Sequence, residues 1–395
     1  MSTNPMHAQV LLLAIAQALF QTAAVMVMAI GGLAGTAVAP SPELATLPIA
    51  AMFLGTAIAI VPAATWMTRV GRRAGFMAGA GLGIVAGLLA AAGAWIGSIW
   101  LLSAGTLFVG MYQATGQFYR FAAGEVADDA YRPRAISLVL AGGVVAAVLG
   151  PWLGRWGGTW GTPAYAGSFL VLIAIGVIAL LVLWRLRVPA PPAAAQGAGR
   201  PLKEIVLQPA YLVALFGAAT GYAVMIMAMT ATPLAMVHHH HNLSDATTVL
   251  QLHFLGMFVP SFFTGSLIAR FGVLRVMMAG VAILAVHVMV TLTGTHFQSF
   301  AVALVLLGVG WNFLYVGGTT LLTTTYKPVE RGRAQAANDM TVFAAALCSS
   351  LVAAPLLNML GWQAMNLVLL PLLAAAALAI GALGWVRWRA APVQG

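Results

Sequence analysis

Charged residues are scarce in this chain, and only eight of them are acidic. Of the 395 residues, 7% are charged and 62% are hydrophobic, which excludes a soluble globular domain. The single cysteine, Cys348, excludes an intramolecular disulfide framework, and we expect it to be a small buried residue rather than a ligand or a redox-sensitive thiol. We find no nucleophile and base pair, no phosphate-binding loop and no carboxylate dyad, so the sequence predicts no enzyme.

The chain is rich instead in apolar runs that are long enough to span a bilayer. Runs of roughly 20 residues, which cross the ~30 Å hydrocarbon core as helices, recur along the whole length. Twelve runs are centred near Leu19, Ala57, Val85, Gly110, Val145, Ile175, Ala223, Val259, Leu284, Leu307, Ala346 and Leu373. The first run lacks a basic flank and a small-residue cleavage site, so it predicts a spanning helix rather than a removable signal.

The basic residues lie almost entirely on one side of this topology. Seventeen of the eighteen Lys and Arg residues fall there, and only Arg155 lies opposite. Positive charge in short loops marks the cytoplasmic face, so we expect both termini to be cytoplasmic. The net charge of +10 therefore reflects topology. It indicates a lipid bilayer as partner and no nucleic acid.

Residues 188–208 interrupt the pattern with a stretch rich in Pro, Ala and Gly, which predicts a cytoplasmic linker. The linker separates an N-terminal half (1–187) from a C-terminal half (209–395). Residues 64–73 resemble residues 265–275, 201 positions later, and the sequence RPRA at 132–135 returns as RGRA at 331–334, 199 positions later. Two repeats in one register predict duplicated halves of six helices each.

These repeated segments resemble the signature of the major facilitator superfamily, G-x-L-x-D-R-x-G-R-R, and the resemblance covers essentially the whole chain. The matching residues are Arg69, Gly71, Arg72 and Arg73 in the first copy and Gly265, Arg270 and Gly272 in the second. Thr68 and Ala269 stand where the family has Asp. The resemblance implies an all-α membrane protein with twelve helices in two pseudo-symmetric halves, and a cytoplasmic latch formed by the matching residues.

A transporter of this architecture binds its substrate near the midplane, between the halves. Only Asp339 among the acidic residues lies inside an expected helix, about two turns from its cytoplasmic end. We therefore expect no deep carboxylate for proton coupling. The deep polar and aromatic candidates are His253, His287, Gln17, Gln21, Gln113, Gln117, Gln251, Asn312, Tyr112, Trp311 and Tyr315. We expect His287 to hydrogen-bond to a neighbouring helix rather than to bind a ligand.

Two consecutive expected helices carry pairs of soft metal ligands four residues apart. Met225 and Met229 lie on the first, and His253 and Met257 on the second. Residues at this spacing share one helical face, and the helix directions place Met229 and His253 at similar depth. Thioethers suit Cu(I), whereas Zn²⁺ requires more His, Cys or acidic ligands. The alternative is packing, because nineteen Met residues produce about one such Met pair by chance.

This pattern resembles the CcoA-type copper importers of bacteria. The resemblance implies that Met225, Met229, His253 and Met257 bind copper and pass it across the bacterial cytoplasmic (inner) membrane. Copper is then the substrate, with no permanently bound cofactor. The resemblance also implies supply of copper to haem-copper oxidase of the cbb3 type, with copper chaperones as downstream partners. The membrane potential provides a hypothetical driving force for inward movement of a monovalent cation.

A histidine run follows the first of these helices. Met236, His238, His239, His240 and His241 form a metal-capture site in one interpretation and a solvated polar loop in the other. The sequence favours neither interpretation.

Two other functions remain open beside copper import. The first is transport of a small organic solute or drug, with Trp311, Tyr315, Tyr112 and Gln113 lining an amphipathic cavity. The second is a membrane sensor or assembly factor that binds metal without moving it. The sequence favours copper import by alternating access.

Overall fold

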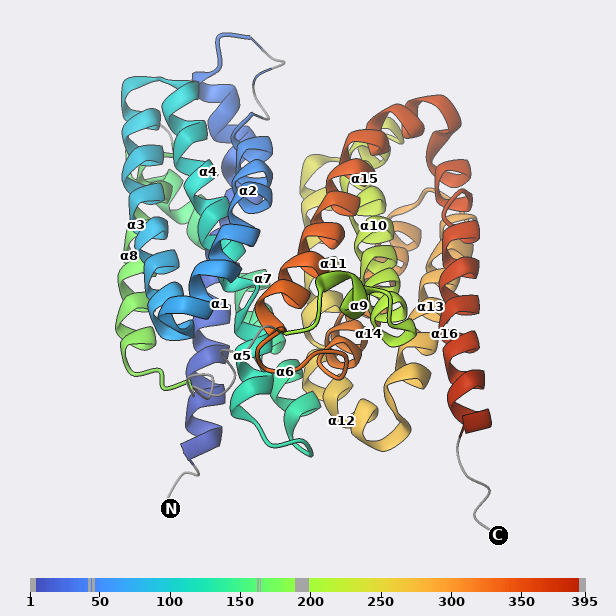
Figure 1. Ribbon diagram of the computed structural model, residues 1–395. Coiled ribbons are helices and arrows are strands. Elements are labelled where there is room, and N and C mark those ends of the chain that lie inside the picture. Colours follow the sequence, from blue (N-terminus) through green and yellow to red (C-terminus); the bar gives the residue numbers. More distant parts are fainter. Residues whose placement is uncertain are drawn as a thin grey trace. The chain divides into compact units, whose positions relative to one another are not determined.

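The computed structural model describes residues 5–41, 44, 47–161, 163, 165–188 and 199–390 (Figure 1). The chain forms two compact units, unit 1 (Met1–Gln196) and unit 2 (Gly197–Gly395). Residues 189–198, the centre of the expected linker, lie outside the described residues. The described end of the linker contains a short helix, α9 (Leu202–Val206).

Unit 1 consists of helices joined by short turns. They are α1 (Pro5–Val38), α2 (Leu47–Val70), α3 (Arg72–Ile96), α4 (Ile99–Gly116), α5 (Tyr119–Val126), α6 (Arg132–Ala141), α7 (Gly143–Gly158) and α8 (Ala166–Trp184). Helix α3 ends at Gly97, which adopts the left-handed conformation, and the Ser98 side chain then caps α4 by accepting a hydrogen bond from the Leu101 N–H.

Unit 2 repeats this arrangement after α9. Its remaining helices are α10 (Pro209–His238), α11 (Leu243–Phe258), α12 (Ser261–Phe271), α13 (Val273–Thr291), α14 (Phe297–Leu322), α15 (Arg331–Leu367) and α16 (Leu370–Ala390). Gly361, with φ +77°, kinks α15 near its end. The Asn242 side chain caps α11 by accepting a hydrogen bond from the Asp245 N–H.

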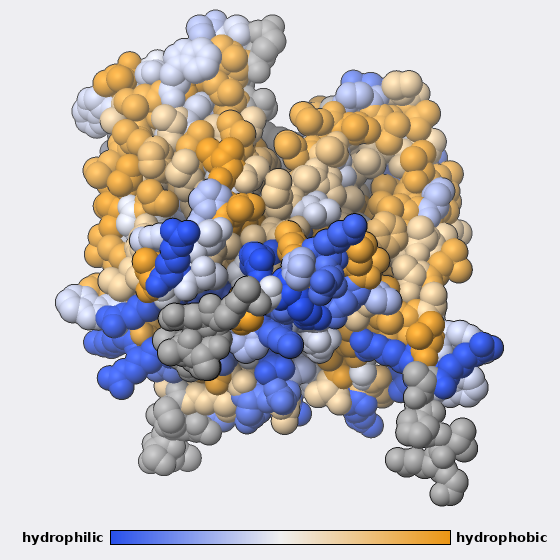
Figure 2. Space-filling model, viewed as in Figure 1, coloured by the Kyte–Doolittle hydropathy of each residue, from blue (hydrophilic) through white to orange (hydrophobic). Residues whose placement is uncertain are grey.

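The all-α membrane fold expected from the sequence is confirmed. Within the described residues, eleven helical stretches are long and apolar enough to cross a membrane. The twelfth expected segment is α4, which is less apolar because it carries Tyr112, Gln113 and Thr115. Large apolar side chains such as Leu181 and Leu351 are more than half exposed, as lipid contact requires. Figure 2 shows hydrophobic residues covering the helices, with the strongly hydrophilic ones gathered mainly toward one end of each unit.

The two units share one set of helix pairings. In unit 1, α4 packs against α2 and α3, α1 against α7, and α3 against α8. In unit 2, α14 packs against α11 and α13, α10 against α15, and α13 against α16. Each pairing in one unit corresponds to one in the other, so the internal repeat seen in the sequence extends to the packing.

Small residues allow the central helices of each unit to approach closely. In unit 1, a Cβ on Gly110 would collide with the Met52 carbonyl oxygen of α2. In unit 2, a Cβ on Gly308 would lie 2.6 Å from the His253 carbonyl oxygen of α11. Without a hydrophobic effect between helices in lipid, such close backbone approach is a main source of helix association.

The linker is fixed to unit 2 at its described end. The Arg200 guanidinium donates hydrogen bonds to the buried Glu330 carboxylate, at 2.8 Å from Nε and 2.6 Å from Nη2. Glu330 also accepts hydrogen bonds from the backbone N–H groups of Arg200 and Lys327. The hydrogen bonds from Arg200 are the main reason that the pKa of Glu330 falls from 4.5 to about 2.

We predict that Gly308→Ala lowers the thermal unfolding temperature of the detergent-solubilised protein. The added methyl group overpacks the contact between α11 and α14, which typically costs about 1–3 kcal/mol. Gly381→Ala on α16 is the control, because its nearest neighbour is the Met278 Cε at 3.9 Å and alanine favours a helix by about 1 kcal/mol. Equal unfolding temperatures for the two variants would contradict this account of the contact.

The interaction between Arg200 and Glu330 predicts how the stability of the protein changes in the acid pH range. Because the pKa of Glu330 is lowered in the folded protein, its contribution is complete above pH 4.5 and is lost as the pH falls toward about 2. Glu330→Gln should lower the unfolding temperature at neutral pH and flatten its decline across this acid range. The exposed Glu204→Gln of α9 serves as control and should retain the wild-type decline. An unchanged slope in Glu330→Gln contradicts the assignment.

Candidate functional site

An aromatic cluster lies in unit 2 where four helices meet. Trp311 and Tyr315 of α14 stack at 4.8 Å between ring centroids, with an interplanar angle of 20°. Tyr222 of α10 contacts both edge to face, at 5.4 and 5.1 Å. Phe343 of α15 and Phe258 of α11 complete the cluster at 5.7 Å from Tyr222 and 6.0 Å from Trp311. Aromatic rings arranged in this way favour stacking against a further flat ring.

Four of the five rings in the cluster are buried. Tyr222 is half-buried, whereas Trp311 and Tyr315 are each 2% exposed. The indole nitrogen of Trp311 is buried and has no hydrogen-bond partner among the described residues. Because buried donors are nearly always satisfied, this N–H is a candidate contact for a polar group of a ligand.

The neighbouring Asn312 holds the helices together instead of facing a ligand. Its side-chain nitrogen donates to the Met257 carbonyl oxygen at 2.7 Å and to the Ser261 hydroxyl at 2.5 Å. Its side-chain oxygen accepts from Thr264 at 2.6 Å. In unit 1, Gln113 of α4 accepts a hydrogen bond from Thr56 of α2 at 3.2 Å. These polar candidates therefore link α14 to α11 and α12, and α4 to α2.

Unit 1 contains a second aromatic cluster, which is fully enclosed. Tyr112 and Tyr119 both contact Phe20, at 6.0 and 6.2 Å between centroids, and Tyr119 also contacts Phe76 at 4.6 Å. None of the four side chains is more than 1% exposed. Tyr112, expected to line a cavity, is instead part of the core of unit 1.

The four expected copper ligands lie on α10 and α11. Helix α11 packs mainly against α14, whereas α10 packs against both α15 and α14. Met225, His253 and Met257 are buried, and Met229 is half-buried. The His253 Nδ1 donates to the Leu304 carbonyl oxygen of α14 at 2.9 Å, and its Nε2 has no hydrogen-bond partner among the described residues. We expected a copper track between α10 and α11 alone, but both of these helices also contact α14.

The histidine run lies at the end of α10 and just beyond it. Met236 is fully buried, and the His241 Nε2 donates to the Thr295 carbonyl oxygen at 2.7 Å. Burial and the neighbouring histidines lower the pKa of His239. The described residues contain no group of three or more His, Cys, Asp or Glu side chains suited to a metal ion. A metal-capture role for the histidine run stays a prediction.

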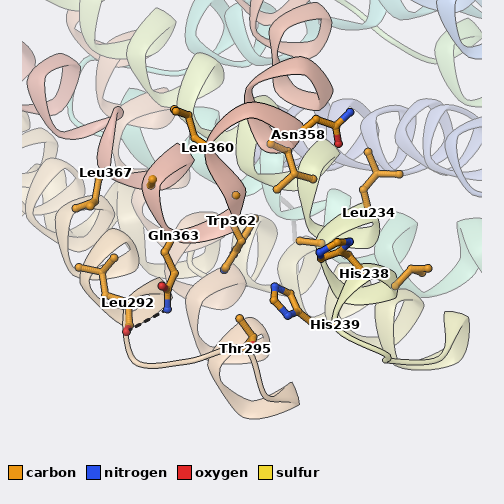
Figure 3. A pocket seen from close by; sticks show the side chains of 15 residues that line it. Leu234, His238, His239, Leu292, Thr295, Asn358, Leu360, Trp362, Gln363 and Leu367 are labelled. Atoms are coloured by element: carbon orange, nitrogen blue, oxygen red, sulfur yellow. Dashed lines mark hydrogen bonds between the residues drawn. The ribbon is translucent and has the colours of Figure 1, made fainter.

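His238 and His239 line a cavity of about 1070 Å³ at the end of α10. Figure 3 shows these two rings on the α10 side of the cavity, with Gln363 and Leu367 on the α15 side. Leu292 and Thr295, from the connection between α13 and α14, form a third wall.

Several other expectations are settled by single contacts. The His287 Nδ1 donates to the Ala303 carbonyl oxygen of α14 at 2.8 Å, which confirms its expected interhelical hydrogen bond. Cys348, expected to be buried, is exposed on α15. Asp339 is buried, and its carboxylate accepts a hydrogen bond from the Asn338 side chain at 2.8 Å.

The expected latch residues have clear local roles. Gly71 and Gly272 precede α3 and α13 with φ near +88° and +86°, a conformation that favours glycine. Arg72 is buried and forms an ion pair with Glu125 at 2.7 Å. The remaining arginines, Arg69, Arg73 and Arg270, are exposed, and Gly265 is buried within α12. A role for these residues in latching the two halves stays a prediction.

The sequence missed Tyr222, Phe258 and Phe343. A usable signal was present, because Trp311 and Tyr315 have the same four-residue spacing as the methionine pair and therefore share one face of α14. The partners of that face come from helices far away in the sequence, so the full cluster requires the fold.

Comparison with known proteins identifies close and distant relatives. A riboflavin transporter, RfnT of Brucella anthropi, is 41% identical over 369 residues, which cover 92% of this chain and 93% of that protein. YddS, an MFS-type transporter of Bacillus subtilis, is 30% identical over 335 residues, covering 79% and 76% of the two chains.

Solved structures support the same fold at low identity. The human organic anion transporter TETRAN has a TM-score of 0.76 at 12% identity and covers 96% of this chain and 100% of its own. The E. coli fucose:proton symporter FucP has a TM-score of 0.73 at 14% identity and covers 94% and 97%.

These relatives overturn the expectation of copper import. RfnT is a riboflavin transporter, not a copper importer of the CcoA type, and its identity extends along nearly the whole chain. The copper interpretation depended on two residue pairs, and the abundance of Met produces about one Met pair at this spacing by chance. Supply of copper to cbb3-type oxidase and the copper chaperones as partners lose their basis with it.

The family is defined by the sequence as well as by the fold. The chain matches the Major Facilitator Superfamily over residues 11–252 and again over residues 214–394. Relatives of at least 30% identity cover more than two thirds of it. This multi-pass membrane protein belongs to the Major Facilitator Superfamily.

Proposed function

We propose that this protein transports a small organic solute, and that the solute is riboflavin or a closely related flavin. The observation that carries this proposal is the 41% identity with RfnT across 92% of the chain. Transport of an organic solute was the alternative to copper in the sequence analysis. The proposed activity is translocation without a catalysed reaction or a permanently bound cofactor.

The aromatic cluster of unit 2 is chemically suited to a flavin. The isoalloxazine ring system is flat, aromatic and uncharged at neutral pH, with carbonyl groups at one edge. Trp311, Tyr315 and Tyr222 provide an aromatic environment that suits a flat ring system, and the Trp311 N–H is a hydrogen-bond donor suited to a carbonyl oxygen. None of the five rings is charged, so a neutral ligand leaves no buried charge unpaired.

The distribution of basic residues supports a location for the activity. Seventeen of eighteen Lys and Arg residues lie on one side of the expected topology, which is the cytoplasmic side by the positive-inside rule. We therefore propose that the protein lies in the bacterial cytoplasmic membrane with both termini in the cytoplasm.

Riboflavin transport can be measured with purified protein in liposomes. Liposomes loaded with unlabelled riboflavin should accumulate external labelled riboflavin by exchange, whereas empty-vector liposomes should not. Excess lumichrome, which retains the ring system without the ribityl chain, should compete, and excess fucose should not. Absence of riboflavin exchange by folded protein would exclude riboflavin as the substrate.

The Trp311 N–H can be tested with a variant that keeps an aromatic ring at this position. Trp311→Phe should raise the KM for riboflavin by about twofold to tenfold, because a hydrogen bond contributes roughly 0.5–1.5 kcal/mol. Trp388→Phe, at a position 70% exposed on α16, should leave the KM unchanged. Initial exchange rates across a range of riboflavin concentrations provide both values. Equal KM values for the two variants would remove Trp311 from the site.

A further inference from the structure

The cavity at the C-terminal end of α10 has the size of a ligand site. Its volume of about 1070 Å³ is slightly above the range of roughly 300–1,000 Å³ for small-molecule pockets. The kink at Gly361 interrupts α15 beside it, and residues on both sides of the kink form part of the wall. The cavity belongs entirely to unit 2.

The lining selects for a neutral solute with polar edges. Hydrogen-bonding side chains are provided by His238, His239, Thr295, Asn358 and Gln363, and the rest of the wall is largely aliphatic (Figure 3). None of the fifteen lining residues is an acid, a lysine or an arginine. The wall therefore lacks the charges that would hold a simple anion or cation, but it offers several hydrogen bonds beside apolar surface.

One wall of the cavity is aromatic and well supported. Trp362 is 4% exposed and packs against Phe300 at 5.1 Å between ring centroids. The His241 ring contacts the same Phe300 at 5.7 Å and is itself fixed by its hydrogen bond to Thr295. Because these rings are already held in place, binding beside them requires little additional ordering of side chains.

The cavity is separate from the aromatic cluster, but α10 and α15 contribute to both. On α10, twelve residues separate Tyr222 from Leu234, which corresponds to about 18 Å along the helix. On α15, fourteen residues separate Phe343 from Leu357, or about 21 Å. The aromatic cluster and the cavity therefore lie about 20 Å apart along these helices.

We infer that this cavity is a second binding site for the planar, neutral solute that the protein transports, an inference that rests on the proposed function. Trp362 contacts the ring system, and His239 and Gln363 hydrogen-bond its polar edge. In the proposed topology the end of α10 is the outer end, so the second site holds solute on the outer side, ahead of the cluster around Trp311.

The stoichiometry of riboflavin binding tests this inference. Ala364→Trp places a large side chain in the cavity, because Ala364 is a half-buried lining residue. Ala379→Trp is the matched control, because it fills a different, apolar cavity of about 370 Å³ between α10, α15 and α16. Equilibrium dialysis with labelled riboflavin should give two molecules bound per wild-type or Ala379→Trp chain, and one per Ala364→Trp or Trp311→Ala chain.

A second variant keeps the test informative where Ala364→Trp does not fold. Gln363→Leu combined with His239→Phe removes two hydrogen-bonding groups and preserves the side-chain bulk. It should weaken the second binding step by about tenfold without changing the first. Two unchanged binding steps in this double variant, or wild-type stoichiometry in Ala364→Trp, would overturn the inference.

The same measurements separate this inference from the proposed function. Two bound riboflavin molecules without exchange in liposomes leave the second site in place and refute riboflavin transport. The opposite result is exchange of riboflavin by wild-type protein that binds only one riboflavin per chain, with Ala364→Trp leaving that number unchanged. This result supports transport and refutes the second site.

Discussion

Unit 2 depends on the close contact between α11 and α14. Because Gly308 has no side chain, the α11 backbone lies where a Cβ would otherwise be, and Gly256 makes the reciprocal approach toward Val305. The contact brings Asn312 within reach of Met257, Ser261 and Thr264. It also fixes the rotation of α14, which directs Trp311 and Tyr315 toward α10 and α15. The aromatic cluster is therefore a consequence of backbone packing several residues away.

The membrane class, the helices and the internal repeat could be predicted from sequence because each depends on local or periodic information. Apolar runs of spanning length admit almost no other structure in lipid. Only α4 among the twelve expected segments is missing from the eleven apolar stretches, and its polar Tyr112 and Gln113 account for this. Glycines at matching positions of the two halves can also be found in the sequence, since Gly55 and Gly256 are separated by the same 201 positions as the repeated loops. The backbone segments that these glycines approach, however, are evident only in the structure.

The candidate site was less predictable because sequence proximity was taken for spatial proximity. Met225 and His253 lie on consecutive expected helices, but both helices have α14 as a main neighbour, and that helix begins at Phe297. The Trp311 and Tyr315 pair was visible, but Tyr222 and Phe343 reach it only through the folded bundle. Specificity also depends on which polar atoms are already satisfied. Asn312 and Trp311 are adjacent in sequence, yet one is fully hydrogen-bonded and the other has a free N–H among the described residues.

The scarcity of charged residues follows from the bilayer, and it also suits the proposed substrate. A bilayer penalises an unpaired charge, so the helices of both units are nearly free of charged residues in their central turns. A neutral, aromatic solute suits such an interior because stacking and single hydrogen bonds are enough to hold it.

The exposure of Cys348 gives the natural protein a built-in reporter. It is the only cysteine of the chain and lies five residues beyond Phe343 on α15, or about 7.5 Å along the helix axis. A fluorophore or spin label attached to this thiol therefore marks one defined position near the aromatic cluster. Spectroscopic studies of α15 can thus begin with the unaltered sequence, without first removing other cysteines.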